Sequence, residues 1–131
     1  YCSTILLFNL WVLSIHFAIF LAIMGGEALA DGNARNGEAI ARLHCARCHV
    51  VSEDDQFAGI GSTPSFMLMV NALKDWEERV ETFYARRPHP VHVRIQGLDP
   101  LTNLPSNAAP IDLNLDEVED ILAYARSLQK D

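Results

Sequence analysis

The stretch Cys45-Ala46-Arg47-Cys48-His49 carries the most chemical information in this chain, because two thiols and an imidazole stand within five residues. A zinc site would need two further ligands at finger-like spacing, and the sequence has no second C-x-x-C pair. A thioredoxin-like redox pair would need a β-α-β context, and no strand pattern surrounds the motif. A structural disulfide between the two cysteines would leave the histidine without a role.

The C-x-x-C-H spacing is instead the attachment pattern of a c-type haem. Two thiols add across the two vinyl groups of the porphyrin and form thioethers, and two intervening residues let both sulfurs reach one edge of the ring. The next residue then lies under the iron as its proximal ligand. We therefore expect one covalent haem on Cys45 and Cys48, with His49 bound to the iron.

The length and charge of the chain exclude several classes of protein. Its 131 residues, 50% of them hydrophobic, allow one small domain and hardly two, so a large multi-domain enzyme is excluded. The formal net charge of −7 argues against a nucleic-acid-binding surface. Three cysteines, one of them Cys2, do not make a disulfide-dense scaffold.

The first thirty residues have the composition of a targeting segment. Residues 5–24 are apolar apart from three polar side chains, and as a helix they would span about 30 Å, the thickness of a bilayer core. Ala28-Leu29-Ala30 before Asp31 fits a signal-peptidase site. We expect residues 1–30 to be a cleaved signal peptide, with a retained membrane anchor as the alternative. In both cases residues 31–131 are periplasmic or otherwise exported, and covalent haem is attached outside the cytoplasmic membrane.

Apolar side chains at three- and four-residue spacing predict helices on both sides of the motif. The first helix runs from about Ala34 into the motif, with an apolar face made of Ala39, Ile40 and Leu43. The period over residues 66–83 predicts two helices, residues 67–73 and 76–86, with a joint at Lys74. Asp75 and Glu78 have the spacing of a capping box at the start of the second of these helices.

The C-terminal part of the chain divides into a loop and a helix. Residues 88–113 hold five prolines and no helical period, so we expect a long loop that wraps the cofactor. Asn114 and Glu117 form a second predicted capping box. The helix that follows has one apolar face, which comprises Val118, Ile121, Leu122, Ala125 and Leu128.

Together, the motif and these elements resemble a small class I cytochrome c, and the resemblance covers nearly all of residues 34–130. It implies an all-α fold of three to four helices around a covalently bound haem, with a long Pro-rich loop before the C-terminal helix. In that family the N- and C-terminal helices cross closely, with a small residue facing an aromatic one, and Gly37 and Tyr124 stand where that pair would be. A proline carbonyl after the motif orients the proximal histidine through its Nδ1–H, and Pro64 fits that position.

The chain departs from the family in its methionines. Most members supply a methionine as the distal iron ligand, some tens of residues after the motif. Met24 lies in the leader, and Met67 and Met69 directly follow Pro64, which should lie on the proximal side. Both of these also fall in an apolar helix, where filling gaps is the usual role of methionine.

Two histidines are the remaining candidates for the distal ligand. Many small relatives carry their methionine three residues after a His-Pro histidine, and His92 stands in that place here, so it is our first candidate. His89 is the weaker candidate, because its two flanking prolines stiffen it and limit its reach. A third alternative is that the iron has no strong protein ligand on this side. Three arginines surround the loop, and they either pair with haem propionates or form a solvated basic patch: Arg86, Arg87 and Arg94.

These features indicate a monohaem electron carrier rather than an enzyme, working between redox proteins outside the cytoplasmic membrane. The acidic surface favours protein partners with a basic docking patch, no nucleic acid, and membrane contact only if residues 5–24 are retained. One alternative is a small-ligand-binding or peroxidase-like haem protein with an open sixth position. Another is a tethered cytochrome subunit of a membrane oxidoreductase.

Cleavage between Ala30 and Asp31 is a prediction of the leader pattern. The exported protein should then begin at Asp31 and fractionate as a free acidic protein, which N-terminal sequencing and intact-mass measurement would check. An N-terminus upstream of Ile5, with the protein in the membrane fraction, would contradict cleavage and support the anchor.

Overall fold

The computed structural model describes residues 32–130, and the expectations for residues 1–30 lie outside the described residues. The described chain is mainly helical, which is compatible with the expected all-α class. Its α-helices and strands, in chain order, are α2 (Ala34–Ile40), α3 (Phe66–Ala72), α4 (Trp76–Glu81), β1 (Val93–Ile95), β2 (Ile111–Leu113) and α5 (Leu115–Ser127). Among the described residues, no helix has both the length and the hydrophobicity that crossing a bilayer requires.

Helix α2 leads directly into the motif, as the sequence predicts. The side chain of Asn33 accepts hydrogen bonds from the backbone N–H groups of Arg35 and Asn36, which begins the helix. At Ala41 the backbone widens into a π-helical turn, Ala41–Cys45, whose last residue is the first cysteine of the motif. Of the predicted apolar face only Ile40 is buried: Ala39 is exposed, and Leu43, inside the widened turn, is 70% exposed, so the prediction is wrong at both of these positions.

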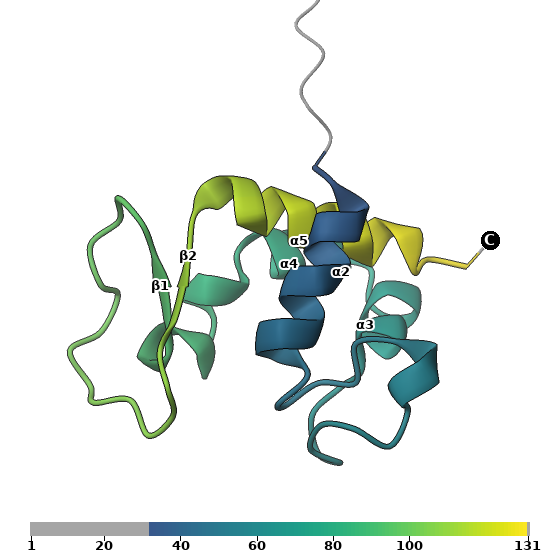
Figure 1. Ribbon diagram of the computed structural model, residues 1–131, viewed down its shortest axis with the longest axis horizontal. Coiled ribbons are helices and arrows are strands. Elements are labelled where there is room, and N and C mark those ends of the chain that lie inside the picture. The colour runs from purple at the N-terminus through teal and green to yellow at the C-terminus, as the bar shows by residue number, and fades with distance from the viewer. Residues whose placement is uncertain (1–31, 131) are drawn as a thin grey trace, which may run out of the picture. The chain divides into compact units, whose positions relative to one another are not determined.

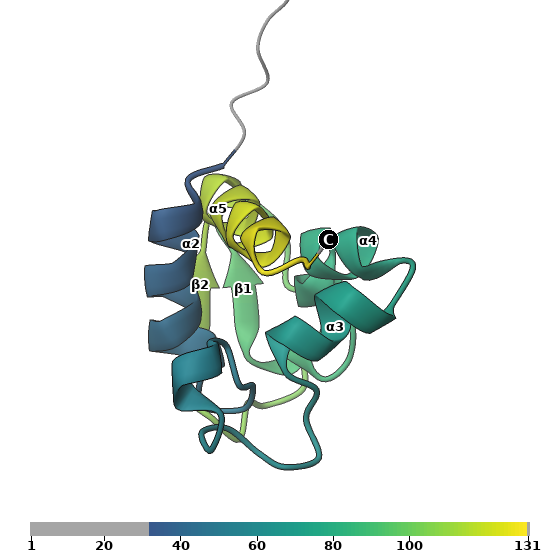
Figure 2. The ribbon, with the colours of Figure 1, turned by 90° about the vertical axis from the view of Figure 1, so that its right-hand side faces the viewer.

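Helix α2 crosses α5 at very short range, and Gly37 is the contact point. A Cβ atom at position 37 would overlap the backbone of Asp120 and Ile121 in α5. The carboxylate of Asp120 accepts hydrogen bonds from the backbone N–H of Asn33 (2.5 Å) and from the side-chain amide of Asn36 (2.7 Å). Figures 1 and 2 show this crossing from two directions. The predicted close crossing is therefore present, but the atoms nearest to a Cβ at Gly37 belong to the backbone of Asp120 and Ile121 and not to the ring of Tyr124, which the resemblance places opposite it.

Helices α3 and α4 form the other side of the core and also pack on α5 (Figure 2). Helix α3 begins one residue before the predicted start, where the Ser65 hydroxyl accepts a hydrogen bond from the backbone N–H of Leu68. Helix α4 ends at Glu81, earlier than predicted, and a 3-10 helix (Phe83–Ala85) follows it. The buried side chains of this pair are Phe66, Val70, Trp76 and Val80, all members of the predicted apolar period.

One of the two predicted capping boxes is wrong and the other is confirmed. Asp75 makes no capping hydrogen bond, because its carboxylate pairs instead with Nε of Arg79, one turn into α4, at 2.9 Å. At the start of α5, Asn114 and Glu117 form the predicted reciprocal pair, with the two N–H···O distances at 2.9 and 2.8 Å. The predicted apolar face of α5 is buried in the core, with Leu128 partly buried at its end.

The segment predicted as a loop contains a two-stranded parallel sheet. β1 and β2 pair in the register Val93 with Ile111 and Ile95 with Leu113. Three-residue strands are too short to show an alternating pattern in the sequence, and their pairing is long-range, so the sequence does not reveal them. The chain between the strands is a long connection that extends away from the helices (Figure 1).

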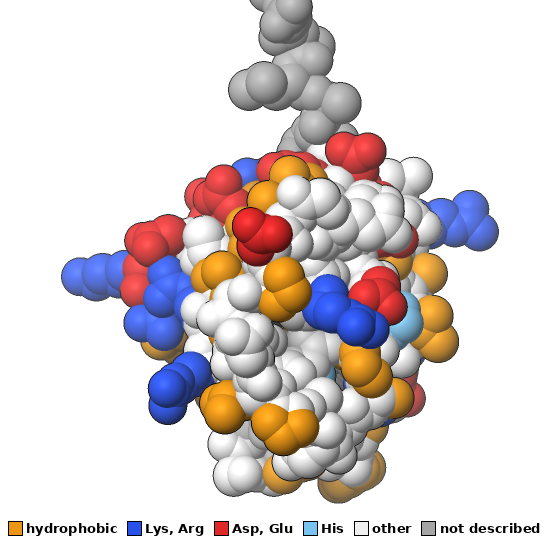
Figure 3. Space-filling view, turned by 90° about the vertical axis from the view of Figure 1, so that its left-hand side faces the viewer, with side chains coloured by type: hydrophobic (Ala, Val, Ile, Leu, Met, Phe, Trp, Pro, Cys, Tyr) orange, Lys and Arg blue, Asp and Glu red, His pale blue; other side chains and the backbone are white. Residues whose placement is uncertain are grey.

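The face that carries β1, β2 and their connection is mixed in character (Figure 3). Hydrophobic side chains are spread over the lower half of this face, and acidic side chains gather near its top. Three leucines of the connection are exposed: Leu98, Leu101 and Leu104.

Replacing Gly37 by alanine should destabilise the fold, because the new Cβ would force α2 away from the α5 backbone. We expect a loss of about 2–3 kcal/mol in the free energy of unfolding from overpacking, although alanine is the better helix former by about 1 kcal/mol. Urea unfolding measures the difference. Gly61→Ala is the matched control, because a Cβ there meets no atom within 4 Å. Equal stability of the two variants would contradict the packing argument.

Candidate functional site

The C-x-x-C-H motif lies on the turn that closes the first helical segment. The backbone N–H groups of Cys48 and His49 both donate to the carbonyl of Cys45, at 3.0 and 2.9 Å. Both motif thiols are free, with Cys45 partly buried and Cys48 exposed. The turn therefore holds two free thiols and the following imidazole within one short backbone loop.

The Cys45 thiol has the character of a protonated group. Burial and, to a lesser extent, the neighbouring Cys48 raise its pKa to about 11, against the opposing effect of Arg47. A redox-active or nucleophilic cysteine instead has a lowered pKa, because the thiolate is the reactive species. Because burial disfavours its thiolate, Cys45 does not have the environment of an activated cysteine.

His49 is oriented by a backbone carbonyl. Its Nδ1 lies 2.8 Å from the carbonyl oxygen of Pro64. A carbonyl oxygen only accepts, so this contact requires the proton on Nδ1 and leaves the Nε2 lone pair available for a metal. The ring of Phe66 meets the His49 ring edge-on, with centroids 5.7 Å apart. The structure therefore places the Pro64 carbonyl where the resemblance expects it.

The loop between the motif and α3 packs against the motif backbone. The backbone N–H of Ile60 donates to the Cys48 carbonyl at 2.9 Å, and the N–H of Phe66 donates to Val50 at the same distance. Gly59 has a φ of 77°, and a Cβ there would come within 2.8 Å of the His49 carbonyl carbon. Glycine is needed at this position both for its left-handed backbone and for the close approach. This loop carries Pro64 to His49.

His89 approaches the motif from a distant part of the chain. It begins a 3-10 helix (His89–Val91), and its Nδ1 lies 3.1 Å from the carbonyl oxygen of Arg86. The ring of Phe83 meets it edge-on, with centroids 5.3 Å apart. Burial lowers the pKa of His89, the Arg86 carbonyl opposes this shift, and His49 adds to it. The ring of His89 is nearly parallel to that of His49, with centroids 6.1 Å apart and an interplanar angle of 11°.

His92, the first candidate for the distal ligand, lies in a different setting. Its backbone N–H donates to the His89 carbonyl at 2.9 Å, and its own carbonyl accepts from Ile111 at 2.7 Å, next to the β1–β2 pairing. Its Nδ1 is buried without a hydrogen-bond partner among the described residues. Among residues 32–130, no ring contact joins His92 to His49. The structure brings His89, rather than His92, beside the motif histidine.

The methionines and arginines have partners of their own. Met67 and Met69 are partly buried against the hydrophobic core, which is the packing role that the sequence favours for them. The guanidinium of Arg86 pairs with Glu78 at 2.7 Å, and that of Arg94 pairs with Asp112 at 2.8 Å. Two of the three arginines proposed to meet propionates therefore already have acidic partners.

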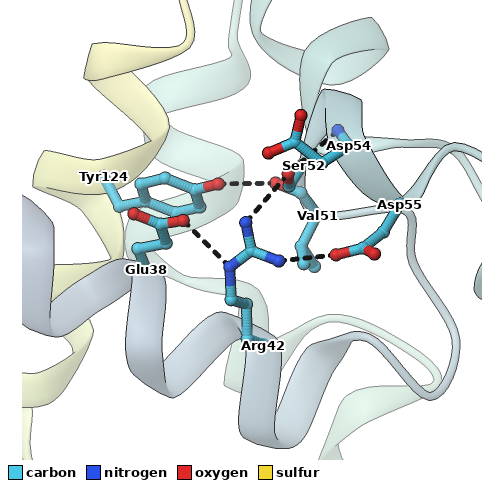
Figure 4. A network of polar contacts seen from close by, with 7 residues as sticks. All are labelled: Glu38, Arg42, Val51, Ser52, Asp54, Asp55 and Tyr124. Carbon is cyan, nitrogen blue, oxygen red and sulfur yellow. Dashed lines mark hydrogen bonds and ion pairs between the residues drawn. The ribbon is translucent and has the colours of Figure 1, made fainter.

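An arginine that the sequence analysis did not single out connects α2 to the segment after the motif (Figure 4). Arg42 binds Glu38 through Nε at 2.9 Å, Asp55 through Nη1 at 2.5 Å and the Ser52 hydroxyl through Nη2 at 3.0 Å. Its pKa is raised, chiefly by the hydrogen bond with Glu38, so it stays charged. In the sequence, the four-residue spacing of Glu38 and Arg42 could have predicted their ion pair, but not the contacts of Arg42 with Ser52 and Asp55.

Tyr124 completes the same network from α5. Its side chain is 5% exposed, and its hydroxyl donates to the Val51 carbonyl at 2.8 Å. Burial, followed by the charge of Glu38, raises its pKa. The Tyr124 ring also lies 6.4 Å from that of Phe66, which in turn contacts His49. Tyr124 therefore connects the C-terminal helix to Val51, just after the motif, and to Phe66, at the start of α3.

No group of three or more His, Cys, Asp or Glu side chains in the described part of the chain is arranged to hold a metal ion by itself. A haem iron does not need such a group. The porphyrin supplies four nitrogens, and the protein contributes at most two axial ligands.

Removing the Tyr124 hydroxyl should weaken the fold by about 1–2 kcal/mol, because Tyr124→Phe leaves the buried Val51 carbonyl unpaired. Chemical unfolding of the variant and the parent chain measures this loss. Tyr84→Phe is the matched control, since the Tyr84 hydroxyl makes no hydrogen bond among the described residues and its removal should cost little. Equal losses in the two variants would contradict a specific role for the Tyr124 hydrogen bond.

Comparison of the chain with protein-family models, with curated proteins and with solved structures found no match.

Proposed function

We propose that this chain is a monohaem c-type cytochrome of the class I type, with the haem joined to Cys45 and Cys48 and with His49 as proximal ligand. It carries one electron at a time between redox proteins outside the cytoplasmic membrane. The observation that carries the proposal is the contact between Nδ1 of His49 and the Pro64 carbonyl, directly after two free thiols at C-x-x-C spacing. That contact prepares Nε2 as a metal ligand, and ligand histidines in metalloproteins are commonly held in this way.

The residues present fit the group that the motif implies. Both thiols are unpaired, as thioether formation with the porphyrin requires. The thiol of Cys45 is desolvated, which suits a position facing an apolar cofactor better than a position in a redox pair. The close crossing of α2 and α5 at Gly37 supports the class I resemblance. The parallel β1–β2 pair is an addition to the elements that the resemblance implies.

The bound haem would supply a one-electron ferric–ferrous couple. The chain's own residues would hold the iron and adjust its electronic properties. By accepting the Nδ1–H of His49, the Pro64 carbonyl fixes the orientation of the imidazole and makes Nε2 a stronger donor. The network of Arg42 and Tyr124 keeps the segment after the motif against α2 and α5, which limits movement around the iron.

The surface charge suggests the kind of protein with which electrons are exchanged. The chain has a formal net charge of −7, and acidic side chains are visible near the top of the face in Figure 3. Long-range attraction would favour redox partners with a basic docking surface, and it would weaken as salt screens the charges.

Replacing the motif cysteines tests covalent attachment. Cys45→Ala and Cys48→Ala should each leave at most one thioether, and the double variant should release its haem into acid acetone. The experiment needs a host that exports the full chain and attaches c-type haem, and it is checked by intact mass under denaturing conditions. Cys2→Ala is the matched control and should retain covalent haem.

The proposal would be contradicted in either of two ways. A double variant that keeps its haem through acid-acetone extraction would show that attachment does not use these thiols. A parent chain that acquires no haem in that host would contradict the proposal as a whole.

A further inference from the structure

We propose that His89, rather than His92, is the second axial ligand, so that two imidazoles bind one iron from opposite sides. This inference rests on the proposed haem at the motif. The two rings belong to segments forty residues apart, and the fold brings them together nearly parallel.

The separation of the two rings fits one metal ion between them. An imidazole nitrogen binds a first-row metal ion at about 2 Å, and the ring centre lies roughly 1 Å behind that nitrogen. Two imidazoles on opposite sides of one iron therefore have ring centres about 6 Å apart. The observed distance between the ring centroids of His49 and His89 is 6.1 Å.

The two histidine rings make the same two kinds of contact: a hydrogen bond from Nδ1 to a backbone carbonyl, and an edge-on contact with a phenylalanine ring. Nδ1 of His49 donates to the Pro64 carbonyl at 2.8 Å, and Nδ1 of His89 donates to the Arg86 carbonyl at 3.1 Å. Both contacts place a proton on Nδ1, so in the neutral form of each ring Nε2 is the nitrogen with the free lone pair. Each ring also meets a phenylalanine edge-on: His49 meets Phe66 and His89 meets Phe83. A backbone carbonyl on the far nitrogen is the usual support for a metal-binding imidazole.

The segment that carries His89 is fixed to α4. The backbone N–H of His89 donates to the Arg86 carbonyl at 3.0 Å. The Arg86 side chain is in turn bound by the Thr82 hydroxyl at 2.9 Å and by the Glu78 carboxylate at 2.7 Å. The carbonyl that orients His89 therefore belongs to a residue with its own side-chain anchors. The backbone already holds the His89 ring beside His49, so the stiffness of the two flanking prolines does not prevent His89 from reaching the motif.

His92 lacks these features. Its Nδ1 is buried with no hydrogen-bond partner among the described residues, so no backbone carbonyl orients this ring in the way that one orients His49 and another orients His89. The His92 carbonyl accepts from the backbone N–H of Ile111, which ties the residue to the start of the strand pairing. We assign His92 a structural position between the 3-10 helix and β1.

Two nitrogen ligands define measurable properties. The haem of the full chain should be six-coordinate and low-spin in both oxidation states, and the ferrous form should not bind carbon monoxide. The ferric form should lack the weak near-infrared sulfur-to-iron band of a His/Met haem. Methionine ligation raises the reduction potential of cytochromes c, so the potential here should lie below that of a His/Met carrier.

Two single replacements separate the candidate ligands. His89→Ala should give a high-spin spectrum and carbon monoxide binding, and added imidazole should restore the low-spin spectrum if the site is otherwise intact. His92→Ala is the matched control and should keep the low-spin spectrum. His89→Met should produce the sulfur-to-iron band and raise the reduction potential. Covalent haem is measured in every variant by intact mass, so loss of attachment is distinguished from loss of a ligand.

Several outcomes would overturn the assignment of His89 while the proposed haem stands. The first is a low-spin His89→Ala variant beside a high-spin His92→Ala variant, which would identify His92 as the ligand. The second is a high-spin, carbon-monoxide-binding parent protein, which would indicate an open sixth position. The third is a sulfur-to-iron band in the parent protein, which would identify Met67 or Met69. A parent chain without covalent haem would overturn both proposals.

Discussion

The close crossing of α2 over α5 at Gly37 is the constraint on which the rest of the structure depends. The absence of a side chain at this position lets the two backbones approach, and Asp120 of α5 then binds the start of α2 through Asn33 and Asn36. Because α2 ends in the motif, this crossing fixes the starting point of the motif relative to the C-terminal helix. The core built on α5 includes Phe66 of α3 and Trp76 of α4, so helices distant in sequence share one packing surface.

Two sets of contacts connect this crossing to the motif histidine. One is polar: Tyr124 donates to the Val51 carbonyl, and Arg42 binds Ser52 and Asp55, so the chain after the motif is held against α2 and α5. The other is aromatic: the Tyr124 ring contacts Phe66, which contacts His49. Individually exposed ion pairs contribute little to stability, but a shared arginine with three partners limits the geometry of the loop it binds. The His49 imidazole is thus oriented by a loop that hydrogen bonds and ion pairs hold against α2 and α5.

The two histidine rings show how function depends on both halves of the chain. The loop 50–65 delivers the Pro64 carbonyl to His49, and the segment after α4 delivers the Arg86 carbonyl to His89. Each carbonyl selects the tautomer of one ring and leaves its Nε2 free. In the proposed haem protein, such preorganisation would let both imidazoles bind the iron without a large rearrangement, and small structural changes on electron transfer would favour fast exchange.

The sequence by itself determined the local features. Apolar periods predicted α3, α4 and α5, and Asn114 with Glu117 predicted the start of α5, because helix periods and caps depend on residues three or four apart. The haem chemistry that the spacing of the motif predicts stays a prediction. The tertiary structure decided what depends on distant contacts. Residues 93–95 and 111–113, far apart in the chain, paired as strands. The wrong prediction at Asp75 was a local one, because its carboxylate binds Arg79, four residues along the chain, instead of capping the helix. Sequence spacing alone favoured His92. Only the fold brought the ring of His89 parallel to His49, because that juxtaposition is set by packing between segments forty residues apart.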